Sequence, residues 1–183
     1  MRRPPTPLDP ERAWDFALRL LGRQAYTAAE VVDRLRRRGL DPERAGRIVA
    51  RLQELGLLDD RAYAVAFVQR RGDERGRNAL RSELRRKGVA EALVEGALDG
   101  GDDRPALDDA QQAGAAAALL RKHAWRFAPR GHGAQAAAAD EHTARHERQR
   151  LRARAAAFLA RRGFAPDVVA EALAGSWGDD ETT

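Results

Sequence analysis

The sequence predicts an all-α protein that is built from three tandem three-helix repeats. Of its 183 residues, 43% are apolar but only 5% are aromatic, so alanine and leucine, which favour helices, supply most of the apolar surface. Valine, isoleucine and threonine, which strands favour, are scarce. One short pattern then occurs three times, as "DRLRRRGL", "SELRRKGV" and "AFLARRGF". Self-similarity of this kind indicates a repeat architecture.

The recurring pattern has the features of a helix end. Each copy has a leucine four residues before the glycine, basic residues directly before the glycine and an apolar residue after it. A glycine after the last helical turn can take the left-handed conformation that closes a helix, and basic side chains there complement the negative helix end. A second helix-like run follows each copy, as "PERAGRIVARL", "AEALVEGAL" and "PDVVAEAL". The unit is therefore a helix, a glycine turn and a helix.

A third helix precedes each pair. In the first unit, apolar residues recur at the spacing of an amphipathic helix (Trp14, Ala17, Leu18, Leu21). The second unit has the same spacing in Tyr63, Ala66, Phe67 and Arg70, and residues 107–125 can serve in the third. Thr27 and Glu30 have the form of a capping box. One such three-helix bundle is marginal alone, and stacking against its neighbours buries more surface.

These elements predict the domain boundaries. We expect a flexible N-terminus at 1–12, a first repeat at 13–58, a second at 59–100, a third at 101–175 and an acidic tail at 176–183. The interval between the second and third turn glycines is longer than that between the first two. We therefore expect an inserted segment near 128–149, with a loop first and a lengthened helix after it.

Two adjacent carboxylates stand out in "GLLDDRAYAVAFVQRR". Paired acids can act as general acid and base or bind a hard metal ion, and they can also begin a helix. With Asp59 as N-cap, Leu58 and Tyr63 take the positions of a hydrophobic staple. Asp60 then lies in the first turn, where negative charge is favoured. This interpretation accounts for both acids and their apolar neighbours, so we assign Leu58, Asp59, Asp60 and Tyr63 a structural role as a helix start.

The sequence offers little for catalysis, and we predict no enzyme, no cofactor and no metal site. Cysteine is absent, which excludes disulfides, thiolate metal sites and cysteine nucleophiles. The two serines lie outside any nucleophile elbow, and "GDERG" lacks the ending of a P-loop. His142 and His146 could share a helix face as a zinc pair would, but a third ligand is not evident. A metalloenzyme that uses the histidines of the insert, His132 among them, is a third candidate function.

The remaining constellation is a set of basic clusters. The net charge is +5 and the pI is about 10.5, values that favour anionic partners. Helix-end electrostatics accounts for one or two charges in each cluster, not three. Aromatic residues do not interleave with the arginines along the chain, so stacking of single-stranded bases has little support. The candidate partner-binding residues are Arg36, Arg37, Arg38, Arg70, Arg71, Arg85, Arg86, Lys87, Arg161 and Arg162.

The stretch "GLLDDRAYAVAFVQRR", followed by "GRNALRSELRRKGV", resembles the central signature of RecX, the bacterial regulatory family that modulates the RecA recombinase. The first unit and "LRARAAAFLARRGFAPDVVAEAL" are similar to it more loosely. The resemblance implies three tandem three-helix repeats in an extended, curved arrangement. It also implies a non-catalytic regulator that binds the filament of RecA on single-stranded DNA, in its groove or at its end. There it inhibits RecA ATPase, strand exchange and coprotease activity, modulating recombination and the SOS response.

Two further expectations complete the sequence-based account. The chain has no apolar signal core and no run long enough to span a membrane, so we expect a cytoplasmic monomer that has no membrane partner and binds DNA weakly and without sequence specificity. The alternative function is a helix-turn-helix DNA-binding transcriptional regulator. Such a regulator should show a strong preference for one duplex sequence over random DNA.

Overall fold

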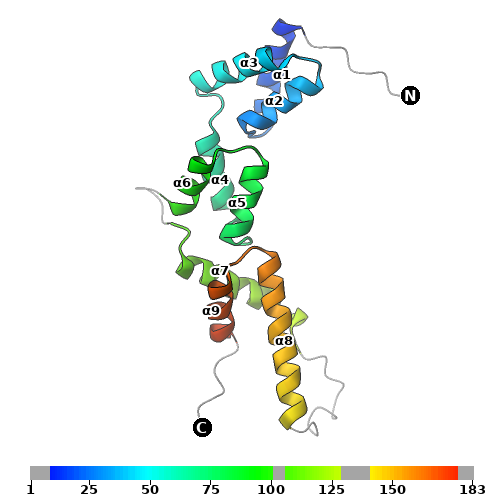
Figure 1. Ribbon diagram of the computed structural model, residues 1–183, viewed down its shortest axis with the longest axis vertical. Coiled ribbons are helices and arrows are strands. Elements are labelled where there is room, and N and C mark those ends of the chain that lie inside the picture. Colours follow the sequence, from blue (N-terminus) through cyan, green and yellow to red (C-terminus); the bar gives the residue numbers. More distant parts are fainter. Residues whose placement is uncertain (1–8, 101–105, 129–140, 177–183) are drawn as a thin grey trace, which may run out of the picture. The chain divides into compact units, whose positions relative to one another are not determined.

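The computed structural model describes residues 9–100, 106–128 and 141–176 (Figure 1). Within these ranges every regular element is a helix and no strand occurs, so the all-α class is confirmed. The helices come in threes, as predicted: α1–α3, α4–α6 and α7–α9. Their bounds are α1 (Pro10–Leu21), α2 (Ala28–Arg37), α3 (Pro42–Glu54), α4 (Asp60–Arg71), α5 (Arg77–Arg86), α6 (Glu91–Asp99), α7 (Asp109–Lys122), the 3-10 helix η1 (Ala124–Arg126), α8 (Glu141–Arg161) and α9 (Pro166–Ser176).

The packing divides the chain into two compact units. One comprises residues 1–68 and 81–101, and the other comprises 69–80 and 102–183. The second repeat is therefore shared, because the end of α4 and the start of α5 belong to the unit that contains the third repeat. The predicted extended, curved arrangement of the whole chain stays a prediction.

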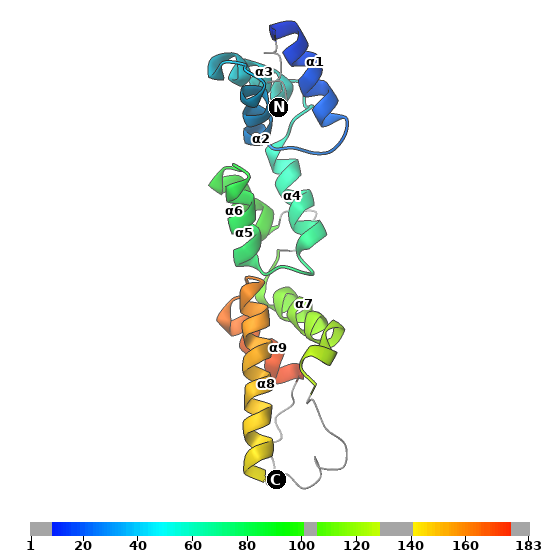
Figure 2. The same ribbon diagram turned by 90° about the vertical axis from the view of Figure 1, so that its right-hand side faces the viewer.

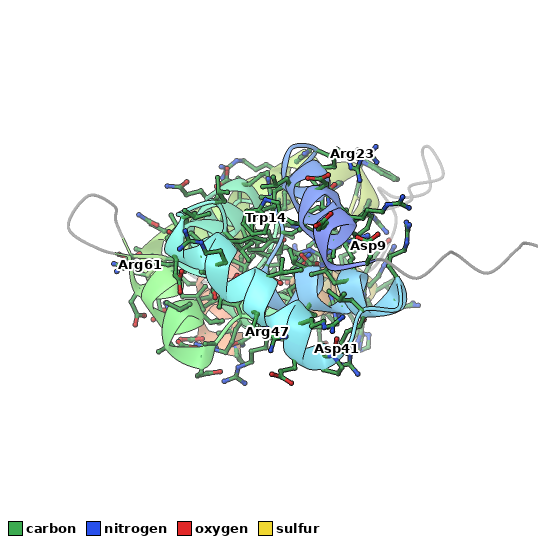
Figure 3. The ribbon with its side chains drawn as sticks, turned by 90° about the horizontal axis from the view of Figure 1, so that it is seen from above. Asp9, Trp14, Arg23, Asp41, Arg47 and Arg61 are labelled. Atoms are coloured by element: carbon green, nitrogen blue, oxygen red, sulfur yellow. The ribbon has the colours of Figure 1, made fainter. Side chains whose placement is uncertain are left out.

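The first unit contains the α1–α3 bundle (Figure 1). Each of its helices begins at a side-chain cap, namely Asp9, Thr27 and Asp41, and the predicted capping box of Thr27 and Glu30 is present. The core includes Val31, Leu35 and Leu52, all with no exposed surface. In Figure 3, Trp14 lies toward the interior of this bundle, whereas Asp9, Arg23 and Asp41 lie at its periphery.

The second unit has its core between α7, α8 and α9. Ala116, Leu119, Phe158, Leu159 and Val168 belong to one buried cluster. The α8 helix runs beside α9 and extends past it (Figure 2). It has 21 residues, against 10 in each of α2 and α5. The C-terminal part of the predicted insert is thus helical from Glu141 on, while the loop expected before it lies outside the described residues. Ser176, which we expected in the tail, is the last residue of α9.

The recurring turn pattern forms the same structure three times. The turn glycines have φ of 85° (Gly39), 80° (Gly88) and 84° (Gly163), a conformation that costs glycine no steric strain. The backbone N–H of the residue after each glycine donates to the carbonyl of the leucine that lies four residues before that glycine. The distances are 3.2 Å (Leu40 to Leu35), 3.2 Å (Val89 to Leu84) and 3.3 Å (Phe164 to Leu159). All three leucines have no exposed surface, and the residue after each glycine is 4% exposed. These are the hydrogen bond and the apolar contact of a Schellman motif.

Candidate partner-binding surface

The two adjacent carboxylates have different structural partners. Asp59 Oδ1 accepts hydrogen bonds from the backbone N–H groups of Arg61 (2.8 Å) and Ala62 (3.0 Å), so Asp59 caps α4. Asp60 Oδ1 instead accepts from the backbone N–H of Ala28 at 2.8 Å. That N–H is at the start of α2, where helix geometry leaves it without an intrahelical partner. Asp60 therefore joins the second repeat to the first.

The environment of Asp60 shifts its ionisation. Burial raises the pKa of the Asp60 carboxyl above its ordinary value, the hydrogen bond from Ala28 opposes this, and the charges of Asp59 and Glu30 raise it further. The hydrogen-bond partner of this carboxylate, the backbone N–H of Ala28, is structural. Across the described residues, no cluster of three or more His, Asp or Glu side chains could hold a metal ion.

Lys87 completes the joint between the first two repeats. Its backbone carbonyl accepts a hydrogen bond from Thr27 Oγ1 at 2.6 Å, and its Nζ lies 2.7 Å from Glu30 Oε1. The ammonium also lies 5.5 Å from the centroid of the Tyr63 ring. Burial lowers the pKa of Lys87, but the hydrogen bonds to Glu30 and Tyr63 raise it, and the net direction is upward. Lys87 thus acts within the fold.

The second unit contains a comparable joint. There the start of α5 meets the turn after α8: the Gly76 N–H donates to the Arg162 carbonyl (2.9 Å), and the Asn78 N–H donates to the Gly163 carbonyl (3.2 Å). The Arg77 N–H donates to Oε1 of Gln112, a residue that is 2% exposed, at 2.8 Å. In both joints, side chains or carbonyls of one repeat satisfy the free N–H groups that begin a helix of the preceding repeat.

The turn glycines also allow this close approach. A Cβ atom on Gly88 would lie 2.3 Å from the Ala29 Cβ, and one on Gly163 would lie 2.4 Å from the Ala79 Cβ. Both distances are shorter than real carbon contacts, so glycine is needed at these two turns for space as well as for backbone conformation.

The predicted basic residues divide according to their distance from the turn glycine. The residue directly before the glycine packs inward in each repeat. The Arg38 guanidinium lies 5.0 Å from the centroid of the Phe16 ring, Lys87 pairs with Glu30, and the Arg162 guanidinium lies 4.7 Å from the Phe158 ring centroid. Arg162 also donates to the backbone carbonyl of Glu74 at 3.0 Å. These three cations make contacts within the fold, so they are weaker candidates for binding an external partner.

The residue two places before the glycine faces solvent in every repeat. Arg86 and Arg161 are exposed and make no ion pair among the described residues, while Arg37 pairs with Asp33 at the surface (2.7 Å). Arg36 and Arg70 are also exposed and without an ion pair there. Arg85 pairs with Glu91, and Arg71 is half-buried with contacts of its own. The side chains best placed to meet an external anion are those of Arg36, Arg37, Arg70, Arg86 and Arg161.

Sequence reasoning missed several residues that the structure singles out. The Arg81 guanidinium pairs with Glu95 from α6 at 2.6 Å, and Gln112 holds the start of α5. Trp125 is 75% exposed, and the arginines of α8 that precede Arg161 belong to no predicted cluster. The strong polarity of "EHTARHERQR" is the one local sign of the α8 arginines. The contacts of Arg81 and Gln112 come from distant parts of the chain, so the sequence around each residue does not predict them.

The histidine pair lies on one helix face, as its spacing suggested. His142 Nε2 and His146 Nε2 are 3.1 Å apart. His132 is outside the described residues. The described helices include none that is long and apolar enough to cross a membrane.

The fold and surface define the class of the protein: a helical repeat protein whose prominent feature is a set of exposed cations. The family models described as "RecX, first three-helix domain" and "RecX, second three-helix domain" match residues 13–52 and 59–98. The chain is 37% identical to the regulatory protein RecX of Halorhodospira halophila over 173 residues, 93% of this chain and 92% of that one. The chain belongs to the RecX family of regulatory proteins, and the resemblance inferred from the sequence is confirmed.

Other relatives match over part of their length. The regulatory protein RecX of Chlorobaculum tepidum is 42% identical over 93 residues, and the match covers 49% of this chain and 58% of that protein. The crystal structure of RecX from Lactobacillus salivarius has a TM-score of 0.69 at 21% identity and covers 91% of this chain and 96% of that one. At this identity the structural likeness establishes the fold.

Proposed function

We propose that the chain binds the filament of RecA on single-stranded DNA, in its groove or at its end, as a non-catalytic regulator. In that position it inhibits RecA ATPase, strand exchange and coprotease activity, and so modulates recombination, DNA repair and the SOS response. Membership of a regulatory family supports this proposal. The proposed partner also places the action of the chain in the cytoplasm, where it works as a monomer.

The observation that carries the proposal is the exposed arginine two residues before the turn glycine. It recurs in all three repeats, as Arg37, Arg86 and Arg161. Guanidinium groups form bidentate pairs with carboxylates and phosphates, and both groups occur on a protein–DNA filament. Weak contacts made by linked repeats add through effective concentration, so cations on successive repeats suit a partner that itself repeats.

The charge of α6 and α9, the third helices of the second and third repeats, argues against the helix-turn-helix alternative for those repeats, whereas α3, the third helix of the first repeat, contains Arg44, Arg47 and Arg51. A recognition helix enters the major groove and reads base edges beside closely spaced phosphates. The α6 helix contains Glu91, Glu95 and Asp99 and no basic residue, and α9 contains Asp167 and Glu171 and no basic residue. Such helices would be repelled by duplex phosphates. The regulator of a filament is therefore the better proposal.

The test is an ATPase assay of RecA on single-stranded DNA into which the chain is titrated. The double variant Arg86→Glu, Arg161→Glu should require several-fold more protein for half-inhibition, with unchanged helicity by circular dichroism. Arg47→Glu, which reverses an exposed arginine on α3, is the matched control and should inhibit like the unchanged chain. Equal inhibition by all three proteins would reject the assignment of these arginines, and no inhibition by the unchanged chain would reject the function.

A further inference from the structure

One aromatic side chain of the third repeat is unusually exposed. Trp125, in η1, is 75% exposed, whereas the other exposed large apolar residues of the described chain, Leu18, Leu55 and Leu57, are between 37% and 50% exposed. Tryptophan has a large apolar surface and is highly buried on average. Indole rings left at a surface are enriched where a partner covers them.

Arg126 links this indole to a second ring and to an arginine of α8. The Arg126 guanidinium lies 5.7 Å from the centroid of the Trp125 ring and 5.5 Å from that of Phe158. Arg154, from α8, donates to the backbone carbonyl of Arg126 at 3.2 Å, which fixes α8 against η1. The expectation that aromatics and arginines do not interleave is therefore wrong for this region. Part of the interleaving is local, since Arg126 lies between Trp125 and Phe127 in the sequence, and part is tertiary, since Arg154 comes from α8.

Next to Trp125, three of the residues just named (Arg126, Arg154 and Phe158) also line a hollow of positive character. Among the described residues, Arg126, Phe127, Arg154, Ala157, Phe158 and Arg161 line a shallow depression of about 130 Å³, and none of these is acidic. A second depression of about 390 Å³ shares Arg154 and continues along α8 past Arg150, and Glu147 is the one acidic residue among the described residues that line it. Nearby, burial and then the positive charges of Arg162 and Arg126 lower the pKa of the His123 imidazole below its ordinary value.

We propose that the surface formed by Trp125, Arg126, Arg154 and Arg161, here called the Trp125 surface, binds single-stranded nucleic acid. A base stacks on the indole, and the adjoining phosphates lie against the guanidinium groups. Every base has a π-face that an aromatic ring can stack on, and guanidinium groups bind phosphate in a bidentate way. A duplex keeps its bases stacked on each other and offers the indole none, so the surface favours a single strand. This inference goes beyond the proposed function, because the surface contacts the strand directly and needs no RecA.

The test is fluorescence anisotropy of a dye-labelled oligothymidylate of about 16 nucleotides, the upper site size of a single-strand-binding domain. The full chain is titrated without RecA. Trp125→Ala should weaken binding by about 5-fold to 150-fold, the equivalent of roughly 1–3 kcal/mol per stacked base. Trp125→Phe should restore most of the affinity. Leu57→Ala, which removes another exposed apolar side chain, is the matched control and should bind like the unchanged chain.

Salt dependence separates stacking from charge. Arg161→Ala should lower the slope of log affinity against log salt concentration by about 0.7, the value for one phosphate contact on a single strand. Trp125→Ala should leave that slope unchanged while it lowers the affinity. A slope that falls equally in both variants would overturn the assignment of the indole to stacking.

Three other results would overturn the inference: unchanged binding by Trp125→Ala, a duplex of equal length bound as tightly as the single strand, or displacement of the strand by polyglutamate at equal charge concentration. The last result would assign the surface to an acidic protein. Because RecA is absent, strand binding without any inhibition of RecA ATPase would reject the proposed function and leave this inference in place.

Discussion

Replacing Asp60 tests whether the paired carboxylates are structural. In Asp60→Ala, the backbone N–H of Ala28 loses the carboxylate oxygen that accepts its hydrogen bond at 2.8 Å. A buried donor left without a partner costs about 1–3 kcal/mol. Asp60 is half-buried, so water can partly replace the carboxylate, and we expect a loss of about 1–2 kcal/mol in the free energy of unfolding.

The variant Asp60→Asn separates the hydrogen bond from the charge. Its amide oxygen can still accept from Ala28, so most of the loss should disappear. The pKa of Asp60 is raised in the folded protein above its ordinary value of 3.8. Between these two pKa values the folded chain holds a proton on Asp60 more readily than the unfolded chain does, so folding is accompanied by proton uptake there. Ionisation of Asp60 therefore opposes folding, and removing its charge should cost little.

The assay is urea unfolding followed by circular dichroism, for the unchanged chain and both variants. At neutral pH, Asp60→Asn should lose less than half of what Asp60→Ala loses. As the pH falls toward 3.8, the unchanged chain should gain stability relative to Asp60→Asn, because only the aspartate takes up a proton. Equal losses in the two variants would refute the reasoning, since the charge and not the hydrogen bond would then matter. An unchanged free energy of unfolding in Asp60→Ala would refute the claim that Asp60 stabilises the joint between the first two repeats.

Three further predictions concern the turns and the core. Gly88→Ala should destabilise the chain by more than about 1 kcal/mol, because φ is 80° and the new Cβ would lie 2.3 Å from the Ala29 Cβ. Gly96→Ala, in α6 with nothing within 4 Å of the new Cβ, should instead stabilise it by about 0.5–1 kcal/mol. Melting temperatures that shift in the same direction for both variants would contradict this. Leu84→Ala should cost about 2–5 kcal/mol in urea unfolding because Leu84 has no exposed surface, and a loss below 1 kcal/mol would show that the site is not core. Lys87→Met removes a cation whose pKa is raised above 10.5. The stability that this cation supplies is complete below pH 10.5 and is lost as the pH rises through the folded-state pKa. Thermal melts of the unchanged chain and the variant should therefore converge at alkaline pH, and melting temperatures that stay equally far apart would disprove the role of the Glu30 ion pair.

Local features of the fold could be predicted from the sequence. The Schellman turn at Gly88 depends on residues that lie within six positions of one another, and so does the capping box of Thr27 and Glu30. The apolar spacing of each helix is equally local. Such features repeat wherever the residues repeat, and this is why the class of the fold and the grouping of helices in threes followed from the sequence.

The partners across repeats could not be predicted in this way. From the sequence, Asp60 was expected to be an acidic residue in the first turn of its own helix. Its carboxylate instead accepts a hydrogen bond from Ala28, which lies 32 residues earlier at the start of α2. Lys87 and Arg86 are neighbours in one basic cluster, but one packs inward and the other faces solvent. The pairing of Trp125 with Arg126 is local, but the arginine of α8 that bonds to the Arg126 carbonyl lies 28 residues away in the sequence. Tertiary packing decides each of these roles.

The most direct test of the central claim, that this helical repeat protein binds a RecA–DNA filament, is cosedimentation with filaments assembled on long single-stranded DNA. The chain should pellet with the filaments in a saturable way, and its bound fraction should fall as salt rises, because exposed guanidinium groups make the contacts. The Arg86→Glu, Arg161→Glu variant should pellet less than Arg47→Glu at equal concentration. A chain that stays in the supernatant at every ratio of protein to filament would contradict the account.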